Sequence, residues 1–208
     1  IRYRLVGSEM CIRDRSVVSQ DSMGGWSRKN YAVGEDPSAI AAGDFDGDGD
    51  VDLAVVLRRT DEVVFLFQTQ PRSYALSPGL RTGGLPRSIH TADLDADGDL
   101  DLVVQSSLIN GVTIYEGDGQ GGFEVGVFTP LDGLGGLRLV DLDHDGDLDW
   151  VFGESSEKAI FYQTAPLRWD LGLELPSVSS GNGTPADLEG DGDVDLVGSR
   201  GPLPVVLW

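Results

Sequence analysis

The sequence predicts an all-β fold made of repeated antiparallel sheets. Acidic loops with one shared nine-residue pattern begin at positions 44, 93, 141 and 187, so they recur every 46 to 49 residues. Short segments rich in β-branched and aromatic residues follow the loops, and helical periodicity is found nowhere. A period of about 40 to 50 residues with several short strands is typical of propeller blades. We therefore expect a partial β-propeller of about three and a half four-stranded antiparallel blades.

Each full repeat contains one strand, the acidic loop and then three more strands. In the first repeat the expected strands are 38–44, 52–58, 62–69 and a weaker one near 73–76. In the second they are 87–93, 101–107, 111–117 and 122–129, and in the third 136–141, 149–155, 158–164 and 168–174. The expected blades are 38–86, 87–135, 136–181 and a truncated one at 182–208, where 202–208 aligns with the third strand of the first repeat.

Two N-terminal segments lie outside these repeats. Residues 1–16 match nothing in the repeats and resemble a translated sequencing-adaptor read-through, so we interpret them as non-native; the alternative is an ordinary N-terminal strand. Residues 17–37, with a strand-like stretch at 29–35, are expected to form the outer edge of a preceding blade. The single cysteine, Cys11, lies in the first segment, so we do not expect disulfides to hold the blades together.

Negative charge is concentrated in the four loops. The chain has 35 acidic and 15 basic residues and a net charge of −20, and the loops contain 20 of the acids. Carboxylates this close together repel one another unless a cation lies among them. Calcium takes six to eight oxygen ligands, and known calcium loops carry carboxylates at positions 1, 3 and 5 and glycine at position 6. All four loops have this spacing, which predicts up to four Ca²⁺ ions, one per loop.

The candidate ligands occupy alternate positions of each loop. Positions 1, 3, 5 and 9 would contribute side chains, and position 7 (Asp50, Asp99, Asp147 and Asp193) its backbone carbonyl. The candidates are Asp44, Asp46, Asp48, Asp50 and Asp52; Asp93, Asp95, Asp97, Asp99 and Asp101; Asp141, Asp143, Asp145, Asp147 and Asp149; and Asp187, Glu189, Asp191, Asp193 and Asp195.

The loops differ from EF-hands, because strands follow them and position 12 lacks the bidentate Glu. The ion is therefore expected to join two strands, and the glycines at position 6 (Gly49, Gly98, Gly146 and Gly192) are expected to adopt positive φ. The fourth loop departs from the pattern, because Glu189 replaces Asp at position 3. The alternative for all four is a solvated acidic turn, since Asp and Gly favour turns for conformational reasons.

The segments PSAIAAGDFDGDGDVDLAVV and LPRSIHTADLDADGDLDLVV resemble FG-GAP/VCBS repeats of calcium-binding β-propellers, which are related to those of the integrin α-chain head. The resemblance covers nearly everything from about residue 30 onward. It is nearest to the bacterial-type branch, because the Phe-Gly and Gly-Ala-Pro signatures of integrins are not evident. It implies that each loop joins the innermost strand to the next and that calcium is a staple within each blade. Structural extracellular modules bind calcium at about 10⁻⁴ to 10⁻³ M, which favours an extracellular, cell-surface or periplasmic location.

We expect a non-catalytic protein, because no GxSxG, HExxH or P-loop motif occurs. Residues 117–122 match GxGxxG, but a strand follows them, which predicts a hairpin turn and not a dinucleotide site. We expect no catalytic role for His90, in a strand, or for His144, at a non-ligand position of the third loop. Tryptophans in strands favour packing between blades over a sugar platform. These are Trp26, Trp150, Trp169 and Trp208.

These observations predict a calcium-binding propeller segment of a secreted or cell-surface protein that acts in adhesion or binds a protein or carbohydrate ligand. Two alternatives stay open: an accessory propeller domain of an extracellular enzyme, such as a polysaccharide-degrading one, and a structural spacer repeat. Nucleic acid is disfavoured as a partner, because the loops are anionic and the sequence has no basic patch. No stretch reaches the ~18 apolar residues of a membrane span.

Overall fold

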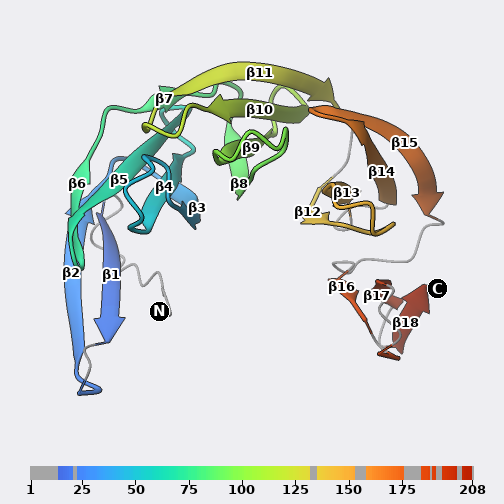
Figure 1. Ribbon diagram of the computed structural model, residues 1–208, viewed down its shortest axis with the longest axis horizontal. Coiled ribbons are helices and arrows are strands. Elements are labelled where there is room, and N and C mark those ends of the chain that lie inside the picture. The colour runs from blue at the N-terminus through green and yellow to red at the C-terminus, as the bar shows by residue number, and fades with distance from the viewer. Residues whose placement is uncertain are drawn as a thin grey trace.

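The computed structural model describes residues 14–20, 23–131, 135–152, 158–175, 184–187, 189–190, 194–200 and 203–207. This part of the chain contains 18 strands and no helix. The strands pair antiparallel within each sheet of this part, and the sheets follow one another along an open arc (Figure 1). The predicted all-β, partial-propeller fold is therefore confirmed.

An N-terminal hairpin precedes the first blade. It consists of β1 (Asp14–Gln20) and β2 (Trp26–Ala32), which pair along their whole length. β1 begins inside the segment that we interpreted as non-native, and residues 1–13 lie outside the described part. Val17 of β1 belongs to a buried cluster with residues of the next sheet, so the hairpin packs against the first blade.

The first blade contains β3 (Pro37–Gly43), β4 (Asp52–Leu57), β5 (Glu62–Gln70), β6 (Ser73–Leu76) and β7 (Leu80–Arg81). The order is β3-β4-β5-β6, and β7 pairs with β5 as well. One strand was predicted near 73–76, but two short strands share this edge. Pro78 lies between them and has no backbone N–H to donate, which explains the interruption.

The second and third blades each have four strands in sequence order. The second contains β8 (Pro86–Ala92), β9 (Asp101–Ser106), β10 (Gly111–Gly117) and β11 (Phe123–Pro130). The third contains β12 (Leu137–Val140), β13 (Asp149–Phe152), β14 (Lys158–Ala165) and β15 (Arg168–Leu175). A three-stranded sheet follows, with β16 (Thr184–Ala186), β17 (Asp195–Arg200) and β18 (Leu203–Leu207).

The blades pack face to face through their central strands. Every residue of β4 and of β13 is buried, because neighbouring sheets cover both faces. One buried cluster joins Val56 of the first blade to Val104 of the second, and another joins Val103 to Trp150 of the third. Side chains on opposite faces of β9 thus enter different cores, as expected for a strand whose residues alternate in direction.

Packing between blades is confirmed for two of the four tryptophans. Trp150 and Trp169 of the third blade stack with ring centroids 4.3 Å apart, and both belong to the buried cluster that contains Val103 of the second blade. Trp26 is 60% exposed on the N-terminal hairpin, and Trp208 lies outside the described residues.

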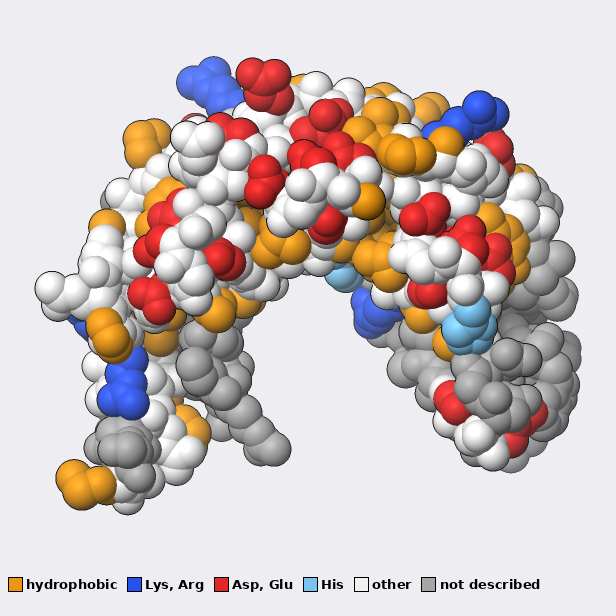
Figure 2. Space-filling view, viewed as in Figure 1, with side chains coloured by type: hydrophobic (Ala, Val, Ile, Leu, Met, Phe, Trp, Pro, Cys, Tyr) orange, Lys and Arg blue, Asp and Glu red, His pale blue; other side chains and the backbone are white. Residues whose placement is uncertain are grey.

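The arc places the acidic loops and the inner strands at distinct surfaces. β3, β8 and β12 line its concave edge, whereas β6, β11 and β15 lie toward its convex side (Figure 1). β8 contacts both β3 and β12, so the inner strands form a continuous wall. Each acidic loop joins an inner strand to the next strand, and Figure 2 shows the acidic side chains in separate groups along the arc.

Candidate metal centres in the acidic loops

Backbone amides fold each loop around its own carboxylates. The carboxylate at position 1 accepts a hydrogen bond from the amide at position 6, as in Gly49 N to Asp44 Oδ2 at 2.9 Å and Gly98 N to Asp93 Oδ2 at 3.0 Å. The third loop repeats this bond between Gly146 N and Asp141 Oδ2 at 3.2 Å. The carboxylate at position 5 accepts from the amide at position 7 in all three loops. These bonds curl the chain so that alternate side chains converge.

Two positions of each of the first three loops have left-handed backbone conformations. The predicted positive φ at position 6 is confirmed, with φ of 88° at Gly49, 98° at Gly98 and 97° at Gly146; Gly192 lies outside the described residues. Position 4 is left-handed too, and the sequence did not reveal this because glycine is not always present. Ala96 has φ of 63° and His144 of 61°, a conformation that is uncommon for residues with a Cβ.

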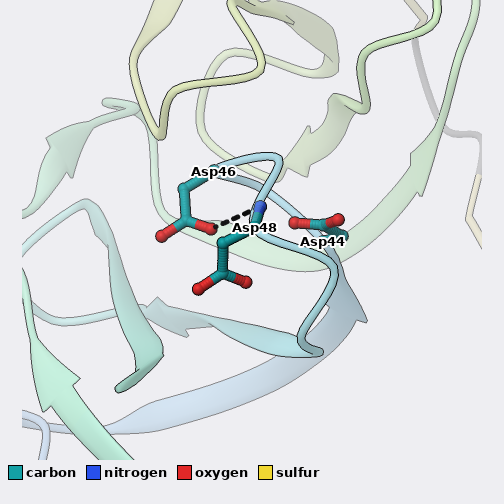
Figure 3. A group of neighbouring side chains, drawn as sticks. All are labelled: Asp44, Asp46 and Asp48. Atoms are coloured by element: carbon teal, nitrogen blue, oxygen red, sulfur yellow. Dashed lines mark hydrogen bonds between the residues drawn. The ribbon is translucent and has the colours of Figure 1, made fainter. Parts of the chain in front are cut away.

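Three carboxylates in each of the first three loops lie close together. The groups are Asp44, Asp46 and Asp48; Asp93, Asp95 and Asp101; and Asp141, Asp143 and Asp149. In each group one oxygen per residue lies within 4.8 Å of the others. Oxygens bound to one Ca²⁺ at 2.3–2.6 Å can be up to ~5 Å apart, so these distances suit a shared ion. Figure 3 shows the first group, with the Asp48 amide donating to the Asp46 carboxylate.

Position 9 has a second role that the sequence did not reveal. Asp52, Asp101 and Asp149 begin the strand after the loop and are buried, at 0%, 2% and 1% exposure. The two oxygens of each carboxylate accept from different amides. One amide belongs to position 2 of the same loop, and the other to the third strand or its end. In the second loop both bonds, from Leu94 N and Gly117 N, are 3.0 Å long.

Burial makes these charges costly. Desolvation raises the pKa of Asp52, Asp101 and Asp149, and the bonds from backbone amides only partly oppose the shift. Desolvation and the neighbouring Asp48 raise the pKa of Asp46. A raised carboxyl pKa means that the protein disfavours the charged form. A cation among these groups would relieve the strain of holding them ionised.

An unpartnered oxygen in the third loop points to the same chemistry. Asp141 Oδ1 is buried and has no hydrogen-bond partner among the described residues, whereas Oδ2 of the same carboxylate accepts from Gly146 N. Buried polar atoms are nearly always satisfied, and a bound cation would satisfy this one. The donor set consists of carboxylate oxygens, which are the ligands that Ca²⁺ prefers, so the residues present fit the ion.

Some candidate ligands lie outside these groups. In the first loop, Asp52 accepts hydrogen bonds from two backbone amides and is not a member of the carboxylate group. The other candidates outside the groups are Asp97, Asp145 and the position 7 residues Asp50, Asp99 and Asp147. In the fourth loop Asp187 and Glu189 are exposed, and Gly190 N donates to Asp187 Oδ1. The predicted ligands Asp191 and Asp193 and the side chain of Asp195 lie outside the described residues.

The loops also connect neighbouring blades. The position 2 side chains Phe45 and Leu94 are buried in the cores between blades, at 2% and 3% exposure. Their carbonyls accept bonds from the next blade: Phe45 O from Gly121 N at 2.9 Å, and Leu94 O from Gln163 Nε2 at 2.7 Å. The loop is therefore part of the interface with the next blade.

The GxGxxG segment is a hairpin turn, as predicted. It joins β10 to β11, and the Asp118 carboxylate accepts from the amides of Gln120 and Gly122, which lowers its pKa. A Cβ on Gly47 of the first loop would lie 2.7 Å from Gly119 O, so the hairpin packs closely against that loop. The glycines serve this contact between blades.

The two histidines lie in different environments. His144 is exposed at position 4 of the third loop. His90 is half-buried in β8, and burial together with the charge of Arg138 lowers its pKa.

Among the described residues, no helix has the length and hydropathy needed to cross a bilayer.

Comparison with known families and proteins supports a propeller built from repeats. Residues 93–152, which run from the second loop through β13, match a family model described as an FG-GAP-like repeat. No curated protein matches the sequence.

Two fungal lectins have similar solved structures. The Agrocybe aegerita lectin, which recognises non-reducing terminal N-acetylglucosamine, has 17% identity and a TM-score of 0.58 over 90% of this chain and 55% of the lectin. The chain thus spans about half the length of that lectin. The Aleuria aurantia lectin, a six-bladed β-propeller that recognises fucose, has 11% identity and a TM-score of 0.47 over 94% of this chain and 74% of the lectin. At these identities the likeness concerns the fold.

Proposed function

We propose that this chain is a non-catalytic, calcium-binding β-propeller segment of a secreted or cell-surface protein. Calcium would act as a staple in each blade, and the propeller would present a ligand-binding surface for carbohydrate or protein in adhesion or recognition. The observation that carries the calcium proposal is a group of three carboxylates, with oxygens within 4.8 Å of one another, in the acidic loop of three successive blades. Positions 1 and 3 belong to all three groups, and the third member is position 5 in the first loop and position 9 in the other two.

The staple role follows from where the clusters lie. Each of the first three loops joins an inner strand to the second strand of its blade, and its position 9 carboxylate accepts a hydrogen bond from the main chain of the third strand. An ion bound by the loop would neutralise charge that now destabilises this junction. Binding to the folded state alone stabilises a protein by mass action, and such weak calcium sites stay loaded only where calcium is near millimolar. This supports an extracellular, cell-surface or periplasmic location.

A carbohydrate ligand is supported by the similarity of this fold to that of a lectin. The Agrocybe aegerita lectin recognises N-acetylglucosamine with a fold that covers 90% of this chain. The described part shows no grouping of carboxylates other than the loop clusters that could hold a metal. Carboxylates committed to calcium cannot act as proton donors, so we propose a binding role in preference to hydrolysis.

Thermal melting of the 208-residue chain tests the calcium proposal. At calcium concentrations ten to a hundred times a site's Kd, one site adds about 1.4 to 2.7 kcal/mol. For a domain of about 200 residues, each kcal/mol raises Tm by about 2–4 °C. We expect Tm to rise by at least several degrees in 10 mM calcium relative to chelator. Magnesium should raise it less, because it demands a rigid octahedral site. Identical melting curves in calcium and chelator would refute the staple.

A triple variant locates the effect. Asp46, Asp95 and Asp143 occupy position 3 of their loops, and each belongs to the carboxylate group of its own loop. Changing all three to Asn should remove most of the calcium-dependent rise in Tm. The control is Glu124→Gln, which removes an exposed charge on β11 outside the loops and should leave the rise intact. A triple variant that responds to calcium like the parent chain would place the ion elsewhere.

A further inference from the structure

A pocket of about 230 Å³ lies at the concave edge of the arc. It is lined by residues of the inner strands β3, β8 and β12, by one residue of β9 and by the residue before β12. None of these lining residues belongs to the acidic loops. The pocket is therefore separate from the candidate metal centres.

The pocket is positively charged in a strongly acidic chain. Arg87, His90 and Arg138 line it, and no Asp or Glu does, although the chain has 35 acidic residues. Figure 2 shows Lys or Arg and His side chains on the concave edge near the middle of the arc, away from the groups of acids. A ligand in this pocket would meet cationic groups from two different blades.

Within the part of the chain that the structure describes, no ion pair joins Arg87 or Arg138 to a carboxylate. Arg138 Nη1 instead donates to Leu137 O at 3.0 Å. Burial lowers the pKa of His90, and the nearby charge of Arg138 lowers it further.

The rest of the lining suits a compact polar ligand. Ser88 Oγ donates to Gln105 Oε1 at 3.3 Å, which fixes two side chains able to bond hydroxyl groups. Ile89 and Leu137, at 6% and 1% exposure, form an apolar base against which a sugar ring could lie. The volume is below the ~300–1,000 Å³ typical of pockets for drug-sized ligands, which favours a ligand of one sugar residue.

We propose that this pocket binds a small carboxylate-bearing sugar of the hexuronate class. A guanidinium presents planar, paired donors that match a carboxylate, and the hydroxyl-binding and apolar groups accommodate the ring. The inference names a ligand class for the ligand-binding role proposed above and rests on that role, but it does not depend on calcium. Absence of a calcium-dependent rise in Tm would contradict the calcium proposal alone, and absence of uronate binding would contradict the pocket proposal alone.

The test is a titration of the 208-residue chain with glucuronate at fixed calcium, followed by NMR of the imidazole signals. The chain has only two histidines, so His90 reports on the pocket and His144 on the third loop. Glucuronate should shift the His90 signal in a saturable way, and glucose should shift it at least about tenfold more weakly, because it lacks the charged partner. A shift of His144 in place of His90 would mean that the sugar competes for calcium, and it would overturn the proposal.

Variants and a second anion complete the test. Arg138→Gln and Arg87→Gln should each weaken glucuronate binding by about tenfold or more. Arg81→Gln, a change of the same charge on exposed β7 outside the pocket, should bind as the parent chain does. Inorganic phosphate should bind more weakly than glucuronate, and equal binding would overturn the sugar-acid class. Unchanged binding in both pocket variants would exclude this site.

Discussion

Replacing Asp101 by Asn tests whether position 9 stabilises the fold without calcium. Asp101 is 2% exposed, and its two oxygens accept from Leu94 N and Gly117 N, each at 3.0 Å. Asn has one acceptor oxygen, so one of these amides would face an NH₂ donor and lose its partner. The junction between the second loop and the end of β10 should weaken.

The magnitude follows from the lost bond. A hydrogen bond to a charged group contributes about 1.5–3 kcal/mol, and a buried donor left unpaired costs about 1–3 kcal/mol. Removing the buried charge offsets part of this loss, because desolvation raises the pKa of Asp101. We expect a net destabilisation of about 2–3 kcal/mol, or a fall in Tm of about 4–12 °C for a chain of this size.

Melting in calcium-free buffer measures the effect, with Asp97→Asn as the matched control. Asp97 lies in the same loop but is exposed, and as Asn it can still accept from Asp99 N. The free energy of unfolding of the Asp97→Asn variant should differ from that of the parent chain by less than about 0.5 kcal/mol. Equal changes in Tm for the two variants would refute the argument, because loop charge alone would then explain both.

Two further predictions concern acid and the cores between blades. The folded-state pKa values of Asp52, Asp101 and Asp149 are raised, so the folded state binds protons more tightly than the unfolded state. Their contribution to stability is complete below the unfolded pKa of 3.8 and is lost as pH rises through the folded values. The Tm of the calcium-free chain should therefore rise as pH falls through those folded values toward 3.8. The gain from calcium should shrink over the same range, because protons compete for the carboxylates. A calcium-free Tm that falls throughout this range would contradict the prediction. Phe45→Ala should lower the free energy of unfolding, measured in urea, by about 3–5 kcal/mol, because the ring lies between blades. Val51→Ala, at an exposed position of the same loop, should lower it little. Similar losses of stability in the two variants would contradict the role of Phe45 in the interface.

The fold could be predicted because two signals agreed. The acidic loops marked the repeat, and the apolar segments after them marked the central strands, which are buried on both faces and therefore strongly patterned. Edge strands were less predictable, since few neighbours constrain them. The outer edge of the first blade is divided between β6 and β7, and the strand expected at 29–35 is shifted to β2.

The candidate site was only partly predictable. The spacing identified the carboxylates that converge, because alternate residues of a curled loop face one point. It could not show that the Asp at position 9 also accepts hydrogen bonds from backbone amides. This role depends on amides contributed by the third strand, such as Gln68 N bound to Asp52 Oδ1 at 2.7 Å, and this partner is distant in sequence. The left-handed Ala96 was missed for a similar reason, because only glycine signals positive φ.

The alternating positions of a loop therefore have different roles. In the first three loops, positions 1 and 3 carry clustered carboxylates and position 9 bonds the third strand of the blade. In the first two loops, position 2 enters the core shared with the next blade. In the first loop, Phe45 is buried beside Phe123 of the second blade while its carbonyl accepts from Gly121 N. An ion that orders Asp44 and Asp46 would order Phe45, which lies between them. Calcium binding and the stacking of blades would then be linked, so that each occupied loop stabilises its own blade and the contact with the blade that follows.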